Sequence, residues 1–467
     1  MIDDRDRFPE TAPHDLALDC LAAGIRAARP DRVVPDRLVL EGSRLLIDGA
    51  ETVDLAAFDR VLVLGGGNAA SQVARELERL LGDRVDGGVV VTDDAVDCER
   101  VRVLPGDHPT PSERGVESAR EVLSAAASAD ADTLVLGVIT GGGSALMPAP
   151  AEGVAGVAGV TLADLRETTE ALLASGAAIG EINAVRKHLS ALKGGRLAAA
   201  AAPATVRCLV LSDVVGDDLS TIASGPFVPD ETTFSDALSV LDRYDLSVPN
   251  AVRERLERGA AGEISETPSA GDPAFDRMRT HVLANGLTAM RAAAGVAREA
   301  DHEPLLVSSR IRGEARDAAV TAAAMAEEAL ATGNPVAPPA VFLSGGETTV
   351  TVEGDGTGGP NQEFALAAAL ELDVSPADRD RVVVGAVDTD GVDGATDAAG
   401  AVLGPDAVAD AERRAAGRAA LADNDAYPVL DAAGALIETG PTGTNVNDLR
   451  VVVVTEAGAA GADRCRK

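Results

Sequence analysis

Five segments of the sequence share one order, in which a short run of Val and Leu residues leads into a turn rich in Gly or Asp. In the clearest of them, RVLVLGGGNAASQVARELERLL at residues 60–81, a helical stretch follows the turn. The other four lie at residues 133–147, 208–218, 342–350 and 382–397. Apolar strands that alternate with helices are typical of parallel sheets covered on both faces, so the sequence predicts an α/β fold. Ligands bind such folds at the carboxyl ends of the strands, where all five turns fall.

The length of the chain and one irregular stretch predict two domains. The 467 residues are 46% hydrophobic, which is enough apolar material for more than one core. Residues 253–273 are charged, contain Gly and Pro and lack a clear period, so we expect the boundary there. We therefore predict an N-terminal domain over residues 1–260 and a C-terminal α/β domain over residues 275–467.

The charge of the chain argues against several classes of partner. Asp and Glu number 75 against 41 Lys and Arg, and the formal net charge is −34. Such a negative field disfavours nucleic acid and anionic membrane surfaces. No apolar run approaches the ~18 residues of a membrane span and the N-terminus lacks a signal sequence, so we expect a cytoplasmic protein. Abundant acidic residues with scarce Lys predict a halophilic protein that stays soluble in concentrated salt.

Lysine is concentrated in one place. Only three lysines occur in the chain, and two of them, Lys187 and Lys193, lie in RKHLSALKGG at residues 186–195. Residues 182–212 contain no Asp or Glu, although the rest of the chain is rich in both. A flexible ammonium suits contact with a moving phosphoryl group, which a planar guanidinium cannot follow in the same way. The alternative is an ordinary solvated helix face.

The spacing of apolar residues in this segment predicts a helix. The helix is expected to continue until Gly194 and Gly195, because glycine commonly ends a helix. Arg186, Lys187 and Lys193 then fall on one polar stripe beside the apolar one. The sequence therefore predicts a cationic helix that faces an anionic ligand.

Two Gly-rich turns follow predicted strands and open predicted helices. The first, GGGNAA at residues 65–70, fits the G-x-G-x-x-A form of the dinucleotide fingerprint, and TGGGSAL at residues 140–146 repeats its pattern. A Gly loop at a helix N-terminus binds any phosphate or carboxylate, so a phosphate cradle, NAD(P) binding and a purely structural turn all stay open. The candidate cofactor-binding residues here are Gly65, Gly66, Gly67, Gly141, Gly142, Gly143 and Ser144.

Carboxylates follow two further predicted strands. Asp213 comes directly after CLVLS, and Asp388 and Asp390 lie in VDTDGVDGATD. Mg²⁺ prefers one or two carboxylates together with substrate phosphates, so these three are the candidate metal ligands. The alternative is that these loops are acidic only because the whole chain is acidic.

The usual signatures of phosphotransferases and hydrolases do not occur in the sequence. A Walker A motif needs Gly-Lys followed by Ser or Thr, and none of the three lysines provides it. The catalytic-loop signature of protein kinases is missing, as are the nucleophile elbow G-x-S-x-G and the metalloprotease motif H-E-x-x-H. A phosphotransferase with this sequence belongs to neither of the two common kinase classes.

Ten blocks of the sequence follow one another in a known order. They are GGGNAA, GDHPTPSERG, TGGGSALM, INAVRKHLSALKGGRLA, LSDVVGDDLSTIASGPFVPD, SSRIRGEARDAA, FLSGGETTV, GGPNQEFALAAA, DTDGVDGATDAAGA and GTNVNDL. In this order they resemble the glycerate 2-kinase family with a C-terminal MOFRL domain, over nearly the full length. The resemblance implies two α/β domains, the first Rossmann-like with a mainly parallel sheet, an active site in the cleft between them, and a MOFRL region at about residues 340–455. It also implies that ATP and Mg²⁺ are used to phosphorylate the 2-hydroxyl of D-glycerate, giving 2-phosphoglycerate.

With this resemblance, each candidate residue receives an expected role. Lys193 and Lys187 are assigned to the transferring phosphoryl group or the substrate carboxylate, and Arg186 to a bidentate anion contact. Asp213 and Asp390 are assigned to Mg²⁺ or to polarising the hydroxyl group. The Gly loops are assigned to phosphates, without a decision on which loop holds ATP.

Two positions depart from the family pattern. The first Gly loop of the family usually reads Gly-Lys-Ala, with the Lys thought to serve catalysis, and this sequence has Asn68 there. The family's Gly-Gly-Arg-Asn-Gln-Glu supplies an Arg where this sequence has Pro360. Asn68 is kept as a catalytic candidate because its amide donates a hydrogen bond without charge. Glu347, in the FLSGGETTV block, is a further candidate for cofactor binding.

Two other functions stay open on the sequence alone. Some members of the family have been labelled hydroxypyruvate reductases, and the G-x-G-x-x-A turn is compatible with NAD(P)H. Asn68 and Pro360 are compatible with a weakened, non-catalytic protein that binds glycerate or a nucleotide. The expected partner is a small-molecule substrate, not nucleic acid or a membrane. A homodimer is compatible with the sequence, which does not fix the oligomeric state.

Overall fold

The computed structural model describes residues 2, 5–154, 156 and 158–456. Its contacts divide the chain into a first unit, residues 30–283, and a second unit, residues 1–29 with 284–467. This division differs from the boundary predicted from the sequence at the N-terminus. Helix α1 (Ala12–Ala28) packs on α11 (Gly286–Glu299) and on β15 (Asp448–Val454), so it belongs to the second unit. The reason is physical, because most of its apolar side chains are buried against that sheet.

The first unit is built on a six-stranded sheet in the order β6-β5-β4-β7-β8-β9. The pairs β4–β5, β5–β6, β4–β7 and β7–β8 are all parallel. The chain therefore builds outward from β4 in one direction and then returns to build outward in the other, which is the order of a Rossmann-type sheet. The strands are β4 (Arg60–Gly66), β5 (Gly87–Thr92), β6 (Val101–Pro105), β7 (Thr133–Ile139), β8 (Thr205–Leu211) and β9 (Met278–Ala284).

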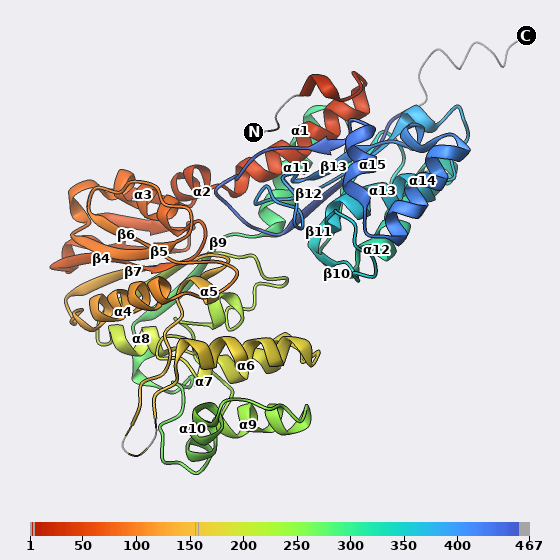
Figure 1. Ribbon diagram of the computed structural model, residues 1–467. Coiled ribbons are helices and arrows are strands. Elements are labelled where there is room, and N and C mark those ends of the chain that lie inside the picture. The colour runs from red at the N-terminus through yellow and green to blue at the C-terminus, as the bar shows by residue number, and fades with distance from the viewer. Residues whose placement is uncertain (1, 3–4, 155, 157, 457–467) are drawn as a thin grey trace, which may run out of the picture. The chain divides into compact units, whose positions relative to one another are not determined.

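Helices cover both faces of this sheet, as the apolar strands require. Helix α3 (Ala70–Leu81) lies over one face and α4 (Glu113–Ala127) over the other (Figure 1). The core on the α4 side combines alternate residues of the strands with α4 and with α8 (Arg196–Ala201). The predicted parallel sheet with two covered faces is therefore confirmed for this unit.

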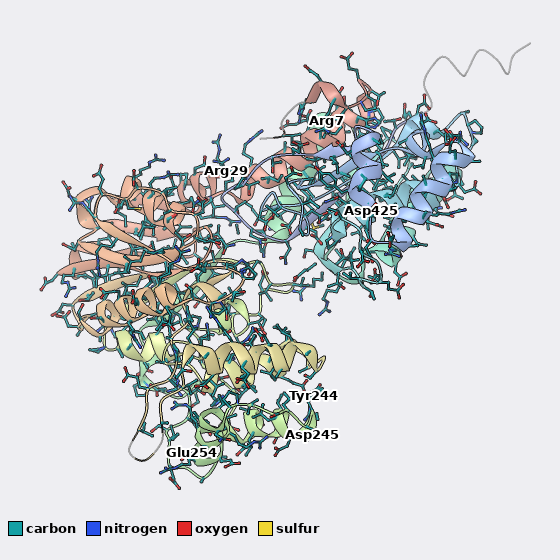
Figure 2. All side chains as sticks on the ribbon, viewed as in Figure 1. Arg7, Arg29, Tyr244, Asp245, Glu254 and Asp425 are labelled. Atoms are coloured by element: carbon teal, nitrogen blue, oxygen red, sulfur yellow. The ribbon has the colours of Figure 1, made fainter. Side chains whose placement is uncertain are left out.

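Two smaller layers complete the first unit. A three-stranded antiparallel sheet is formed by β1 (Leu38–Glu41), β2 (Arg44–Ile47) and β3 (Glu51–Asp54) after α2 (Pro30–Arg37). A helical lobe with its own apolar core gathers α6, α7, α9 and α10 (Figure 1). Their bounds, with that of the short α5, are α5 (Gly143–Leu146), α6 (Leu162–Ala174), α7 (Ile179–His188), α9 (Phe234–Arg243) and α10 (Asn250–Ala260). Tyr244 and Asp245 mark the end of α9 in Figure 2.

The second unit is built on a mixed six-stranded sheet in the order β10-β11-β15-β12-β13-β14. Strands β10 and β11 are parallel, while β15 runs antiparallel to both β11 and β12. The carboxyl ends of β11 and β12 therefore meet the beginning of β15 at one edge of the sheet. The strands are β10 (Glu303–Glu314), β11 (Ala340–Thr349), β12 (Val382–Asp388), β13 (Gly400–Leu403), β14 (Leu436–Ile437) and β15.

Ala-rich helices cover the faces of this second sheet. α1 and α11 contact it on one side, and α12 (Ala315–Thr332) and α13 (Pro360–Glu371) form an apolar core with β11, β12 and β15. Helices α14 (Ala411–Ala422) and α15 (Ala426–Ala432) pack on α13. At the N-terminus of this unit, Arg7, which is labelled in Figure 2, forms ion pairs with Asp431 and Glu438. Within the described residues, no helix has both the length and the apolar character needed to cross a membrane.

Candidate active site

The two Gly loops of the first unit meet where the strand order reverses, between β4 and β7. The Asn68 N–H donates to the Gly141 carbonyl oxygen at 2.8 Å. A Cβ atom on Gly142, which has φ +74°, would overlap Asn68 Oδ1, and one on Gly141 would overlap the Asp213 carboxylate. The structure therefore brings Asn68, both Gly loops and Asp213 together, although they come from three different strand ends. Rossmann-type sheets bind their ligands at this reversal point.

The Lys193 side chain contacts the second Gly loop. Its Nζ donates to the Ser144 carbonyl oxygen at 2.6 Å, and the side chain is buried. Burial and, to a smaller extent, the charge of the nearby Arg186 guanidinium lower the pKa of Lys193 to about 7. An ammonium without a carboxylate partner is unstable in such surroundings, so an anion brought beside it would be bound favourably.

Arg186, on α7, adds a second positive charge to this position. Its side chain is partly buried, and desolvation lowers the pKa of the guanidinium from its ordinary value. Among the described residues, neither Arg186 nor Lys193 has a carboxylate partner. Two uncompensated cations in a chain with a net charge of −34 are the arrangement expected for an anion site.

Lys187 has different surroundings from Lys193. Its Nζ lies 3.1 Å from Asp230 Oδ1, and both side chains are buried. Asp230 Oδ1 also accepts hydrogen bonds from the backbone N–H of Thr232 at 3.1 Å and from its hydroxyl at 2.8 Å. The pair joins α7 to the loop before α9, and both of its side chains lie against Gly194.

The predicted helix through this segment ends earlier than expected. Helix α7 stops at His188, and Lys193 lies in the turn between α7 and α8 rather than on a helix face. Ser190 Oγ accepts the backbone N–H groups of Leu192 and Lys193 at 3.1 and 3.2 Å, which replaces the helical hydrogen bonds. The continuous cationic helix was therefore wrong, because a serine side chain competes with the backbone for these donors.

A buried chain of polar groups continues from the second Gly loop. Ser144 Oγ lies 3.0 Å from Ser224 Oγ, and the Ser224 hydroxyl donates to Asn183 Oδ1 at 3.1 Å. The Nδ2 atom of Asn183 is buried, and no described group accepts from it. The sequence prediction did not include Ser224. Its only signal was the turn-forming Ser-Gly-Pro at residues 224–226.

The other two predicted metal ligands lie in the second unit, whereas Asp213 lies in the first. Asp388 ends β12, and its carboxylate accepts the backbone N–H of Asp390 at 3.2 Å. Burial, followed by the charges of Asp390 and Asp448, raises the pKa of Asp388 well above its ordinary value. The described residues contain no group of three or more His, Cys, Asp or Glu side chains placed to hold a metal ion.

Pro360 has a structural explanation in the second unit. It is the first residue of α13, a position where the missing N–H of proline is tolerated. The next two backbone N–H groups, of Asn361 and Gln362, each donate to the Asp393 carboxylate at 2.9 Å. Burial raises the pKa of Asp393 to about 7.

Glu347 lies at the carboxyl end of β11, beside Arg312 in the register of β10. Its side chain is exposed, and desolvation together with the neighbouring Asp448 raises its pKa. Asp448 in turn accepts from the backbone N–H of Thr348 at 3.1 Å and forms a buried ion pair with Arg450. Glu347 therefore lies in the second unit, near Asp448, while the two Gly loops belong to the first unit.

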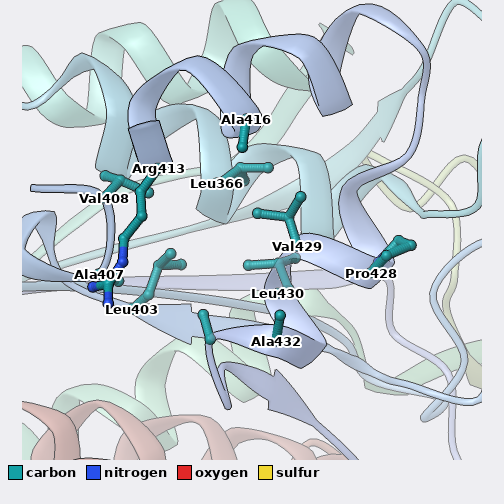
Figure 3. A pocket seen from close by; sticks show the side chains of 11 residues that line it. Leu366, Leu403, Ala407, Val408, Arg413, Ala416, Pro428, Val429, Leu430 and Ala432 are labelled. Atoms are coloured by element: carbon teal, nitrogen blue, oxygen red, sulfur yellow. The ribbon is translucent and has the colours of Figure 1, made fainter. Parts of the chain in front are cut away.

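A cavity of about 420 Å³ lies elsewhere in the second unit, against α13, α14 and α15 (Figure 3). Its lining is aliphatic apart from Arg413, and Leu366, Leu403 and Val429 form part of its wall. It contains none of the predicted site residues. A phosphoryl-transfer site needs several charged or polar groups that converge, so we place the candidate site at the Gly loops.

Comparison with known proteins identifies the family. A family model described as "Domain of unknown function (DUF4147)" matches residues 16–257, and the MOFRL family model matches residues 340–448. A glycerate 2-kinase of Pyrococcus horikoshii is 38% identical over 449 residues, which cover 94% of this chain and 97% of that protein. The chain belongs to the glycerate 2-kinase family. A second member, the D-glycerate 2-kinase of Thermotoga maritima, is 36% identical and is matched over 98% of its length.

Solved structures of the glycerate 2-kinase family have the same fold. The crystal structure of a Pyrococcus horikoshii protein superposes with a TM-score of 0.81 at 36% identity, covering 96% of this chain and all of that one. The crystal structure of Thermotoga maritima glycerate kinase gives 0.81 at 35% identity, covering 95% of this chain and 99% of that one. An Agrobacterium vitis relative, 42% identical over 85% of this chain and 99% of that protein, has hydroxypyruvate reductase as its provisional name.

Proposed function

We propose that this chain is a glycerate 2-kinase that transfers the terminal phosphoryl group of ATP to the 2-hydroxyl of D-glycerate. The product is 2-phosphoglycerate. The observation that carries the proposal is the pair Arg186 and Lys193, two cations without carboxylate partners beside the Gly loop at residues 141–143. The names of the relatives from Pyrococcus horikoshii and Thermotoga maritima support the same reaction.

Phosphoryl transfer requires positioning and charge neutralisation more than covalent chemistry. Arg186 and Lys193 serve this need by binding the glycerate carboxylate or the transferring phosphoryl group. These anions supply the negative charge that no carboxylate of the described residues provides to the two cations. Lys187 keeps its own carboxylate, Asp230, and positions the turn that carries Lys193. The Asp213 carboxylate lies against Gly141 of the second Gly loop, where it would polarise the glycerate hydroxyl.

The carboxylates present are compatible with Mg²⁺ bound mainly through substrate phosphates. Such an ion takes only one or two carboxylates from a protein, so it does not need a cluster of three or more, and the described residues contain no such cluster. When bound, Mg²⁺ neutralises charge on the phosphates of ATP. Asp388 fits this use, because burial and the charges of Asp390 and Asp448 raise its pKa, and a bound cation would offset both effects.

A reductase with NAD(P)H is the second candidate, supported by the names of two Agrobacterium vitis relatives. The first Gly loop fits that use poorly. Cβ atoms on Gly65 and Gly67 would overlap the backbone at Val138 and Thr140, so these glycines are needed for packing within the sheet. Asp94, the acid after the next strand, accepts from Gln72 Nε2 at 2.7 Å, where the fingerprint would use it for a ribose.

Two assays separate these readings in the purified protein. With ATP, Mg²⁺ and D-glycerate in molar KCl, we expect formation of ADP that depends on D-glycerate. With hydroxypyruvate and NADH or NADPH, we expect no change in absorbance at 340 nm. Oxidation of the nicotinamide without glycerate-dependent ADP would favour the reductase. A ligand-dependent thermal shift without turnover would favour a binding protein.

A further inference from the structure

Two consecutive residues other than glycine adopt left-handed backbone conformations beside the second Gly loop. Ala223 has φ 49° and ψ 20°, and Ser224 has φ 60°, followed by Gly225 at φ 66°. Residues with a Cβ atom rarely occupy this region, because it costs them free energy. Where such residues occur, the surrounding structure must hold them, and they are frequent at functional sites.

The turn that carries Lys193 holds this strained segment in place. The Gly194 N–H donates to the Ser224 carbonyl oxygen at 3.0 Å, and the Gly195 N–H donates to the Gly225 carbonyl oxygen at 2.7 Å. On the opposite side, Ala223 lies close to Gly143 of the second Gly loop. The strained backbone therefore fixes Ser224 between the two segments that form the candidate anion site.

The hydrogen bonds of Ser224 set the direction of the neighbouring hydroxyl. Asn183 Oδ1 can only accept, so the Ser224 hydroxyl donates to it and its oxygen receives the proton of Ser144 Oγ. The Ser144 proton is then directed toward Ser224. The Ser144 oxygen is left as an acceptor, and the Ser144 side chain is only partly buried, whereas Ser224 is 1% exposed.

We propose that Ser224 is a positioning residue of the glycerate site, whose hydroxyl orients Ser144 so that Ser144 Oγ accepts a hydrogen bond from a hydroxyl group of the substrate. This inference rests on the proposed function. It adds recognition of a hydroxyl group to the recognition of anions by Arg186 and Lys193. A serine whose proton is already donated to Ser224 cannot donate to a phosphate, so Ser144 contacts a hydroxyl group and not the phosphates of ATP.

Glycine substitutions separate the hydroxyl from the strain. Ser224→Gly removes the hydroxyl and relieves the left-handed backbone. The relief offsets part of the cost of leaving Asn183 Oδ1 without its donor, so we expect a melting temperature within a few degrees of wild type. We expect kcat/KM for D-glycerate to fall on the order of 10-fold or more, as for loss of one oriented hydrogen bond, while KM for ATP stays within about twofold. Ala223→Gly, the matched control, relieves the same kind of strain and should keep kcat/KM within about threefold.

A double variant tests the route of the effect. Because Ser224 acts through Ser144, the variant Ser144→Ala with Ser224→Gly should be no less active than Ser144→Ala alone. The proposal is overturned if Ser224→Gly keeps wild-type kcat/KM, if Ala223→Gly loses as much activity, or if the losses of the two serine variants multiply in the double variant. A wild-type protein without glycerate kinase activity would refute the proposed function, whereas an active wild type with an equally active Ser224→Gly would refute this inference alone.

Discussion

The Nζ atom of Lys187 lies 3.1 Å from Oδ1 of Asp230, with both side chains buried, whereas Lys193, six residues later, donates only to the Ser144 carbonyl oxygen. The only two lysines among the described residues thus stand in opposite electrostatic situations. One has a carboxylate partner and the other has a neighbouring arginine. This difference gives each lysine a separate test.

Lys187→Met should destabilise the protein, and it should lower activity only indirectly, by loosening the turn that carries Lys193. The change leaves the Asp230 carboxylate buried without its ammonium partner, and breaking a buried ion pair costs about 3–5 kcal/mol. Urea denaturation in molar KCl measures the change in the free energy of unfolding. The variant that also carries Asp230→Asn should recover part of the loss, since it removes the unpaired charge. A change below about 0.5 kcal/mol in the single variant would contradict a structural role for the pair.

Lys193 should make the reaction depend on pH above neutrality. Its pKa of about 7 means that the ammonium is present below pH 7 and is lost above it, so kcat/KM for D-glycerate should fall as the pH rises through 7. A bound anion stabilises the ammonium, so the corresponding fall in kcat should occur at higher pH. A flat kcat/KM profile between pH 6 and 9, within about twofold, would contradict this role.

Lys193→Arg should remove that alkaline fall, because a guanidinium stays charged over this range. The same change should lower kcat on the order of 100-fold, since a planar fork displaces the anion by about 1 Å. The melting temperature should stay within a few degrees of wild type, which separates this outcome from misfolding. An arginine variant with normal turnover would show that the position tolerates any cation and that Lys193 does not contact the reacting group.

Asp393 should make the stability of the protein decrease with pH in the acidic range. Its folded pKa of about 7 lies above the ordinary value of 3.8, so between these values the folded state binds more protons than the unfolded state. This group then contributes a loss of up to roughly 4 kcal/mol as the pH rises from 4 to 7. Lys193 adds little slope there, because its ammonium stays protonated below pH 7 in both states.

Asp393→Asn should flatten this part of the stability profile. The free energy of unfolding at pH 5 and pH 7 gives the slope for the variant and for wild type. Asp245→Asn, at an exposed side chain with a left-handed backbone that Asn also tolerates, controls for the loss of one charge. Equal slopes in wild type and Asp393→Asn would contradict the assigned titration.

Salt should stabilise the fold as a whole. With a net charge of −34, repulsion between acidic groups acts over about 30 Å at 0.01 M salt but only about 3 Å at 1 M. We expect the melting temperature and the activity to rise together as KCl increases from 0.01 M to 1 M. Unchanged melting in dilute buffer would refute a halophilic protein.

The sequence predicted those parts of the fold that follow from repeated local patterns. Apolar strands followed by Gly-rich turns, such as residues 60–81, predicted the parallel sheet and the place where its loops meet. The assignment of α1 to the second unit could not be predicted, because an apolar helix does not specify which of two sheets it covers. The antiparallel β1–β3 sheet was missed, since its short strands carry few buried residues.

The candidate site was predicted less completely than the fold. The unusual use of lysine singled out Lys187 and Lys193. Only the structure shows that Lys187 forms an ion pair with Asp230, a residue distant in sequence. The end of α7 depends on hydrogen bonds to Ser190 Oγ, which compete with a strong helical pattern. The left-handed conformation of Ser224 depends on hydrogen bonds that Gly194 and Gly195 donate to Ser224 and Gly225. No local sequence pattern predicts such a conformation for a serine.

The product of the reaction tests the central claim most directly. The protein is incubated with ATP, Mg²⁺ and D-glycerate in molar KCl, and the phosphorus NMR spectrum of the product is compared with those of 2- and 3-phosphoglycerate. The account predicts 2-phosphoglycerate, formed with ADP and only when D-glycerate is present. Formation of 3-phosphoglycerate, or no phosphorylated glycerate while hydroxypyruvate is reduced by NADH or NADPH, would contradict it.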